Sequence, residues 1–245
     1  MGGFGDLPTV AEGGAYTELT ISDTAETSAW LKKGGFIGIT LEAIDKDDTG
    51  KIAAIPKQLA SSAYRTLSAA VANIFTQSAG VGPTLASDSL ALFHATHANL
   101  GVTALTAANW EVAIQSMYKQ AQLSSARRLG ARPERLLVPI ELEATAAQIV
   151  GSDVMDSALQ RNVRKGSARV VTCPEFTDAN DWACLADPMK NPALGIGFRF
   201  GRVPEVFSDP GGQRMFTNDQ LDLKARYFFT VGVIDYRAVR KHNVA

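Results

Sequence analysis

Two strand-like stretches near the start of the chain need a partner that the surrounding sequence does not supply. The first, YTELTIS (residues 16–22), alternates in polarity, and the second, FIGITLEAI (residues 36–44), is rich in branched side chains. The segment between them is polar apart from Trp30 and Leu31. We expect residues 16–40 to form a long two-stranded projection, and a lone ribbon of this kind is only marginally stable in water. The pattern therefore indicates support from another molecule, such as a partner subunit.

The segment that follows predicts the clearest helix of the chain. Pro56 suits the first helical turn, where no backbone donor is needed. About twenty residues at ~1.5 Å each would make a rod roughly 30 Å long. Apolar residues recur close to the helical period, and the stripe consists of Ile55, Leu59, Ala63, Leu67, Val71 and Phe75.

Shorter elements are expected further along the chain. Thr106 is suited to the N-cap of a second helix, and a third helix is expected from Pro139 to Gly151. Strands are expected at residues 135–138, at 169–172 and in WACLADP from residue 182. In the closing stretch from residue 221 to 233 every odd position is apolar or aromatic. This alternation predicts a long strand that starts half-exposed and ends buried on both faces.

Composition bounds the class of protein. The 245 residues can bury a sizeable core in one or two domains, and the hydrophobic and charged fractions (46% and 20%) are those of an ordinary globular protein. A formal charge of −1 disfavours a dedicated nucleic-acid binder. No secretory signal and no membrane-spanning apolar run are evident. Cys173 and Cys184 are interpreted as reduced, partly buried side chains of a protein made in a cytoplasm.

Two sequence features resemble metal sites. His94 and His97, three residues apart in ALFHATHANLG, could bind a metal if a third ligand were near, but the pair lies in a loop-like stretch. The third histidine, His242, lies in a C-terminal stretch that looks disordered. The acidic stretch from Asp45 to Pro56 resembles a calcium loop but has Pro at the position of the bidentate Glu. We interpret the histidines as loop-stabilising and the acidic stretch as a solvated turn.

The chain also carries a basic cluster and lacks the common catalytic motifs. Arg161, Arg164, Lys165 and Arg169 suit a solvated surface or a subunit contact better than a phosphate site, because no aromatic residues are interleaved. The chain has no dinucleotide fingerprint, phosphate-binding loop or nucleophile elbow. We therefore expect a protein that is not an enzyme and carries no cofactor or metal.

The order of elements and several local stretches resemble a known family. GITLEAIDKDDTGKIAAIPKQLASSAYRTL, LFHATHANLG, RPERLLVPIELEATAAQIV, LADPMKNPALGIGFRFGRVPEV and ARYFFTVGVIDYRAV are similar to segments of the major capsid proteins of tailed bacteriophages, in particular relatives of the Mu-type major head protein. The similar stretches cover nearly the whole chain. None of them is a catalytic signature.

The resemblance implies an α+β chain with the Hong Kong 97-like capsid fold. The parts that it implies are an N-terminal arm (1–15), an extended loop (16–40), a peripheral domain with a spine helix (41–102), an axial domain (103–196) and returning strands of the peripheral domain (197–245). A start at the arm suits either a matured form or a complete gene product.

The resemblance also implies a function. The chain would be a structural subunit that self-assembles into hexamers and pentamers of an icosahedral head around double-stranded DNA, which it contacts non-specifically. Portal, scaffold or decoration proteins are possible partners, and no membrane is involved. The protein would belong to the virion and would assemble in the bacterial host cytoplasm.

The expected assembly contacts lie in two places. Trp30, Leu31, Lys32 and Lys33 lie in the predicted projection, and Arg161, Arg164 and Lys165 lie in the basic cluster. In some relatives a lysine of the extended loop is joined covalently to a neighbour's Asn, but no motif here identifies an acceptor. Two alternatives stay open: an encapsulin-type nanocompartment shell, and a metal-dependent hydrolase using His94 and His97.

Overall fold

The computed structural model describes residues 9–13, 15–16, 18, 25–47, 49–123, 127–154 and 161–244. The chain divides into two compact units. Unit 1 comprises residues 1–27, 72–195 and 232–245, and unit 2 comprises residues 28–71 and 196–231. Among the described residues, no helix combines the length and the apolar character needed to cross a bilayer.

Unit 2 is built on a sheet whose central strand is the long β8 (Gln220–Val233). The strand β1 (Leu31–Thr40) pairs antiparallel with β8 along all ten of its residues, from Leu31 opposite Phe229 to Thr40 opposite Gln220. The strands β6 (Leu194–Phe198) and β7 (Glu205–Asp209) also pair with β8.

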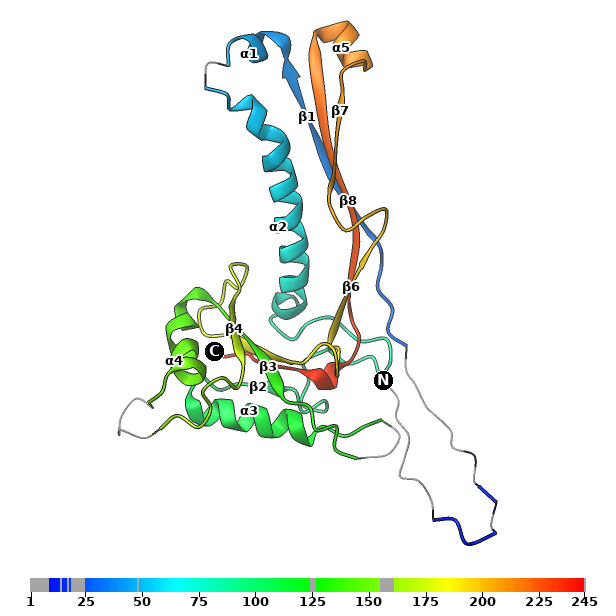
Figure 1. Ribbon diagram of the computed structural model, residues 1–245, viewed down its shortest axis with the longest axis vertical. Helices are drawn as coiled ribbons and strands as arrows, with labels where there is room; N and C mark the ends of the chain where they lie inside the picture. Colours follow the sequence, from blue (N-terminus) through cyan, green and yellow to red (C-terminus); the bar gives the residue numbers. More distant parts are fainter. Residues whose placement is uncertain are drawn as a thin grey trace. The chain divides into compact units, whose positions relative to one another are not determined.

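A long helix covers one face of this sheet. In Figure 1, α2 (Ile55–Thr76) runs along the strands of unit 2, and the ring of Tyr64 meets that of Tyr227 edge-on, with centroids 6.3 Å apart. The helix agrees with the sequence prediction in both position and length. It is preceded by α1 (Leu41–Asp45) and by a short 3-10 turn, η1 (Ile52–Ala54).

The acidic stretch before α2 is a turn in which a carboxylate side chain binds backbone N–H groups of the same turn. The Asp47 carboxylate accepts hydrogen bonds from the backbone N–H groups of Ile52 at 2.8 Å and Lys51 at 3.1 Å, and from the Thr49 hydroxyl. The bond from Ile52 is the main cause that lowers the pKa of Asp47. The carboxylate oxygens thus bind the chain's own backbone, which agrees with the interpretation of the stretch as a turn.

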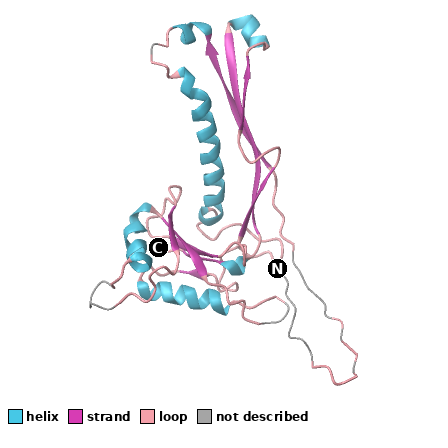
Figure 2. Ribbon diagram, viewed as in Figure 1, coloured by secondary structure: helices cyan, strands magenta, loops and turns pink. Residues whose placement is uncertain are grey.

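Unit 1 contains a five-stranded mixed sheet in the order β2-β9-β5-β3-β4. Strands are magenta and helices cyan in Figure 2. Helix α3 (Ala107–Lys119) packs on this sheet through Trp110, whose ring lies 6.3 Å from that of Trp182, and the Thr106 hydroxyl caps the helix as predicted. The strands are β2 (Leu100–Gly101), β3 (Pro133–Val138), β4 (Arg169–Thr172), β5 (Trp182–Ala186) and β9 (Val239–His242). The remaining helical elements of the chain are η2 (Ile140–Leu142), α4 (Glu143–Gly151), α5 (Gln213–Asn218) and η3 (Tyr236–Ala238).

Three sequence-based expectations are corrected. The expected ribbon within residues 16–40 is wrong for its second half, because residues 31–40 pair with β8; in the first half, residues 17 and 19–24 lie outside the described part. The end of β8 is half-buried, not buried on both faces. The stretch containing His242 is not disordered: it forms β9, whose four residues are all buried, because it lies between β2 and β5.

Candidate assembly surface

The strand β1 is an exposed edge of the unit 2 sheet. Of its ten residues only Ile39 is buried, and within the described chain its backbone pairs with β8 alone. An edge strand leaves every second backbone N–H and C=O group without a strand partner and is therefore a template for another chain. This makes β1 a surface on which a second molecule can bind.

The sheet face that carries the even-numbered residues of β1 and β8 combines cations with aromatic rings. Register places Lys32 opposite Phe228, Phe36 opposite Lys224, and Lys224 opposite Phe207 of β7, so these side chains share one face. We call this the cation–aromatic face; it consists of Trp30, Lys32, Phe36, Arg199, Phe200, Phe207, Arg214, Lys224, Arg226 and Phe228.

Close contacts hold the cations over the rings of this face. The Arg226 guanidinium carbon lies 4.8 Å from the centre of the Phe207 ring, and Lys224 Nζ lies 5.3 Å from it. The corresponding distances are 5.7 Å for Lys32 over Phe228, 5.4 Å for Arg214 over Phe36 and 5.5 Å for Arg199 over Trp30. Such stacking is stabilising when the pair is desolvated and weaker when it is exposed.

Glycines in β1 leave room for the long side chains of this face. A Cβ atom at Gly34 would lie 2.7 Å from the Ala225 carbonyl oxygen and 3.3 Å from Arg226 Cα. A Cβ atom at Gly38 would lie 3.0 Å from the Asp222 carboxylate and 3.2 Å from the Arg214 guanidinium. The alternation of Gly with Lys32 and Phe36 therefore lets the cations of β8 and α5 lie across the edge strand.

The predicted contact residues of β1 divide between the two faces of the strand. Trp30 and Lys32 belong to the cation–aromatic face, whereas Leu31 and Lys33 point to the opposite side by strand alternation. The Trp30 indole lies over Gly197, where an added Cβ would be 3.2 Å from the ring, and is still 49% exposed. Leu31 and Lys33 are also exposed. All four side chains are thus accessible in the single chain.

The second predicted cluster of contact residues lies in unit 1, and its Arg164 and Lys165 form ion pairs with acidic side chains. Arg164 forms a two-pronged contact with Glu111, with Nε and Nη2 2.6 and 2.7 Å from the carboxylate oxygens. Lys165 Nζ lies 2.5 Å from Asp153. Arg161 is exposed, and the neighbouring Asn162 is buried and donates to two backbone carbonyls. A cavity of about 510 Å³ adjoins the Glu111–Arg164 pair.

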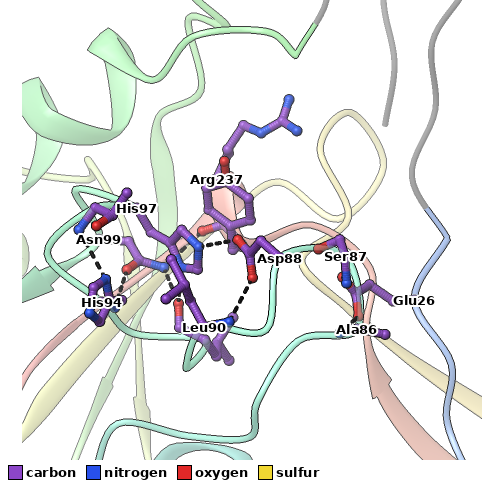
Figure 3. Close-up of polar contacts among 12 residues, drawn as sticks. Glu26, Ala86, Ser87, Asp88, Leu90, His94, His97, Asn99 and Arg237 are labelled. Carbon is purple, nitrogen blue, oxygen red and sulfur yellow. Dashed lines mark hydrogen bonds and ion pairs between the residues drawn. The ribbon is translucent and has the colours of Figure 1, made fainter.

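The two neighbouring histidines lie in the loop that follows α2, as expected, and they stabilise it (Figure 3). His97 is 3% exposed; its Nδ1 lies 3.0 Å from the Leu92 carbonyl oxygen, and its Nε2 lies 2.6 Å from the Asp88 carboxylate. His94 Nδ1 accepts a hydrogen bond from the Thr96 N–H. Both ring nitrogens of His97 are therefore engaged by groups of its own loop. Within the described residues, no cluster of three or more His, Cys, Asp or Glu side chains has the geometry of a metal site.

Removing the partner of His97 should weaken unit 1. We expect Asp88→Ala to lower the free energy of unfolding by about 1–3 kcal/mol, because it leaves a buried imidazole N–H without an acceptor. Chemical denaturation followed by tryptophan fluorescence measures the change, with Glu134→Ala, at an exposed position of β3, as the control. An equal effect of the two substitutions would show that the Asp88–His97 contact contributes nothing specific.

The same loop binds the segment that leads into unit 2. The Glu26 carboxylate accepts hydrogen bonds from the backbone N–H groups of Ala86 at 2.8 Å and Ser87 at 3.2 Å (Figure 3). Asp88 also accepts from the Leu90 N–H, which fixes the turn that presents these donors. Nothing in the local sequence around Glu26 indicates this contact, because its partners lie sixty residues further along the chain.

Sequence reasoning also missed a buried basic strand. In β9, Lys241 Nζ lies 2.6 Å from the Asp181 carboxylate and donates to the carbonyl oxygens of Phe75 and Gly80. The sequence "RKH" is typical of a solvated end, and no local signal marks these side chains as buried.

The two thiols are unpaired and unsuited to nucleophilic chemistry. Burial raises the pKa of Cys184 to about 12, and burial together with the charge of Glu175 raises that of Cys173 to about 11. A thiol with such a pKa is protonated near neutral pH and is a poor nucleophile. These features agree with the interpretation of both residues as packed side chains.

Comparisons with known proteins identify the family of this chain. Residues 25–242 match the sequence profile of a family described as phage capsid protein. Solved structures from Gordonia phage Cozz (14% identity, TM-score 0.60), Microbacterium phage Oxtober96 (9%, 0.61) and the capsid of Myoviridae phage XM1 (13%, 0.59) have the same fold. They match 100%, 100% and 99% of this chain and 80%, 83% and 82% of their own. No curated protein matches significantly. With a profile match over most of its length and the mixed helix-and-sheet fold of phage capsids, the chain belongs to the phage capsid protein family and is a structural protein of the virion.

Proposed function

We propose that this capsid protein builds an icosahedral phage head by self-assembly of hexamers and pentamers around double-stranded DNA. The observation that carries the proposal is the exposed β1 edge beside an exposed face of cations and aromatic rings. Large apolar side chains grouped on a surface mark an interaction site. Residues 1–15 would form an arm, residues 16–40 an extended loop, residues 41–102 and 197–245 the peripheral domain, and residues 103–196 the axial domain.

Several contacts would act together in such a shell. Trp30, Leu31 and Lys32 are proposed to contact a neighbouring copy, with Lys33 beside them. Arg161, which is exposed, is proposed as a second contact, whereas Arg164 and Lys165 would contribute through the surface that they shape with Glu111 and Asp153. Many modest interfaces per subunit supply avidity that no single interface needs.

Other components of the head would join this assembly. Portal, scaffold and decoration proteins are proposed partners, DNA would be contacted without sequence preference, and assembly would take place in the host cytoplasm. The solved relatives named above are phage proteins, which favours a phage head over the encapsulin-type shell. The occupied nitrogens of His97 argue against the hydrolase.

The proposal predicts particle formation that depends on Trp30. We expect the purified chain to sediment as rings or shells of megadalton mass, visible in negative-stain micrographs. Trp30→Ala should shift most of the protein to free subunits, because an exposed aromatic anchor is lost, and Trp30→Phe should restore particles. Circular dichroism checks that each variant is folded. A wild-type chain that stays monomeric at every concentration, with scaffold added, would contradict the function.

A further inference from the structure

A cavity in unit 1 lies where helix α2 ends, apart from the residues proposed for assembly. Its volume is about 320 Å³, which is within the range of pockets that bind small molecules. Phe75 and Phe176 supply an aromatic wall, and the centroids of their rings lie 5.8 Å apart. The polar side chains that determine which molecule can fill the cavity are Asp178, Asp181, Lys241 and Asn243.

The charge of the lining favours a cation over an anion. Its ionisable side chains are Asp178, Asp181 and Lys241, so two negative charges and one positive charge leave a net charge of −1. The last residue of α2, Thr76, also reaches the cavity and brings the negative end of the helix dipole with it. The faces of aromatic rings attract cations as well. An anion would meet unfavourable charge here, whereas a cation finds both carboxylates and ring faces.

The lining already binds one alkylammonium group, which belongs to the chain itself. Lys241 Nζ lies 2.6 Å from the Asp181 carboxylate. It also donates to the carbonyl oxygens of Phe75 and Gly80, each at 2.9 Å. A Cβ atom at Gly80 would lie 2.5 Å from this nitrogen, so the glycine leaves room for the ammonium. One carboxylate and two carbonyl oxygens satisfy the three N–H donors of an ammonium ion, and groups of the same kind can bind a second one.

The turn beside the cavity is held in an unusual backbone conformation. Ser78, Ala79 and Gly80 follow one another with φ angles of 55°, 54° and 84°. In residues other than glycine this left-handed conformation is disfavoured by contact between Cβ and a carbonyl oxygen. The Ala79 carbonyl oxygen accepts a hydrogen bond from Asn243 Nδ2 at 3.0 Å. The turn is therefore kept in shape by side chains that line the cavity, and its carbonyl oxygens are fixed in place.

Both aspartates of the cavity can accept further hydrogen bonds. Asp181 uses one oxygen for Lys241 and the other for the Val244 N–H at 2.8 Å, and a carboxylate has about four acceptor sites. Asp178 is exposed, and its Oδ1 accepts from the Asn180 N–H, whereas its Oδ2 has no partner among the described residues. A bare divalent cation is less suited, because the described part of the chain has no cluster of three or more side chains that could hold it.

We propose that this cavity binds a primary alkylammonium group from solution. The N–H donors of the ligand would bind the Asp178 and Asp181 carboxylates, and its alkyl chain would pack against Phe176. The site goes beyond the proposed function, because shell formation does not require it. Free alkyl amines and the lysine side chains of other proteins share this chemistry, and two probes distinguish these sources.

Calorimetric titration of the full-length protein with n-butylamine, which is charged near neutral pH, tests the site. We expect saturable binding of one amine per chain and none of tetramethylammonium, which has no N–H donor. Asp178→Asn should weaken binding by about tenfold, because one carboxylate loses its charge. Thr177→Phe, which adds a ring at an exposed position of the lining, should abolish it. Glu175→Gln removes the same charge from the same loop outside the lining and should bind like the wild type.

A second titration, with Nα-acetyl-lysine amide, identifies the source of the amine. Binding of butylamine, with or without the lysine derivative, assigns the site to free amines, and binding of the lysine derivative alone assigns it to a protein side chain. The site is wrong if neither probe saturates at any concentration tested, if magnesium or tetramethylammonium competes as well as the amine, or if Thr177→Phe binds unchanged. Equal weakening by Glu175→Gln and Asp178→Asn would also overturn it. Circular dichroism checks that each variant is folded, and the titration does not depend on particle formation.

Discussion

Replacing Lys241 by Met should lower the free energy of unfolding of unit 1 by about 3–5 kcal/mol, which is the usual cost of leaving a buried carboxylate without its partner. The side chains of Lys241 and Asp181 are only 2% and 9% exposed, and Nζ lies 2.6 Å from Asp181. The same ammonium donates to the carbonyl oxygens of Phe75 and Gly80, each at 2.9 Å. Methionine replaces the aliphatic part of the lysine side chain, lacks its terminal ammonium and so removes all three of these contacts.

A double substitution separates the charge from the packing. Adding Asp181→Asn to Lys241→Met should recover part of the loss, because no unpaired charge remains and an amide oxygen can still accept from the Val244 N–H. Urea unfolding at pH 7, followed by the fluorescence of Trp110 and Trp182, measures each variant. A loss below about 1 kcal/mol in the single variant would mean that water in the adjoining cavity of about 320 Å³ solvates Asp181 in place of the lysine.

Unit 1 should also lose stability in mild acid because of His242. Burial, with a smaller contribution from the charge of Arg240, lowers the pKa of His242 from 6.5 to about 4. The ring stacks on Trp182 at 3.9 Å and accepts from Arg240 Nε at 3.1 Å, so folding holds it neutral. Between pH 6.5 and 4 the unfolded chain binds a proton that the folded chain excludes. The stability is therefore complete above about pH 6.5 and decreases as the pH falls, by up to ~3 kcal/mol near pH 4.

Comparison with His242→Gln isolates this effect. Glutamine does not titrate, so the variant should have a flatter stability profile between pH 6.5 and 4 and, although less stable at pH 7, should approach the wild type in acid. Asp88, whose pKa is lowered from 3.8, loses its charge below this window. Parallel wild-type and variant profiles would show that another group controls the acid response.

Elements defined by local patterns were predictable from the sequence. The helix α2 follows from its apolar stripe, α3 from the Thr106 cap, and β8 from strict alternation over residues 221–233. In each case the signal lies inside the element, because a helical face or a strand face repeats within a few residues.

Features that depend on distant partners were not predictable. The pairing of β1 with β8 joins residues far apart in the sequence, and the burial of Lys241 depends on Asp181 and on the end of α2. The candidate surface was therefore only half identified. Trp30 and Lys32 were named from the sequence. Placing Lys32 on one face with Phe207 and Lys224 requires the register of β1, β8 and β7. Arg214 reaches the same face from α5, which no local pattern indicates.

The place of β9 in the unit 1 sheet determines when that sheet can be completed. β9 lies between β2 and β5 although it follows all the other described strands in the sequence. A ribosome must therefore finish β9 before β2 can join the rest of the sheet and before the end of α2 receives the Lys241 ammonium. Nascent chains that have not reached β9 lack a finished unit 1, and this delays association between subunits until β9 has been made.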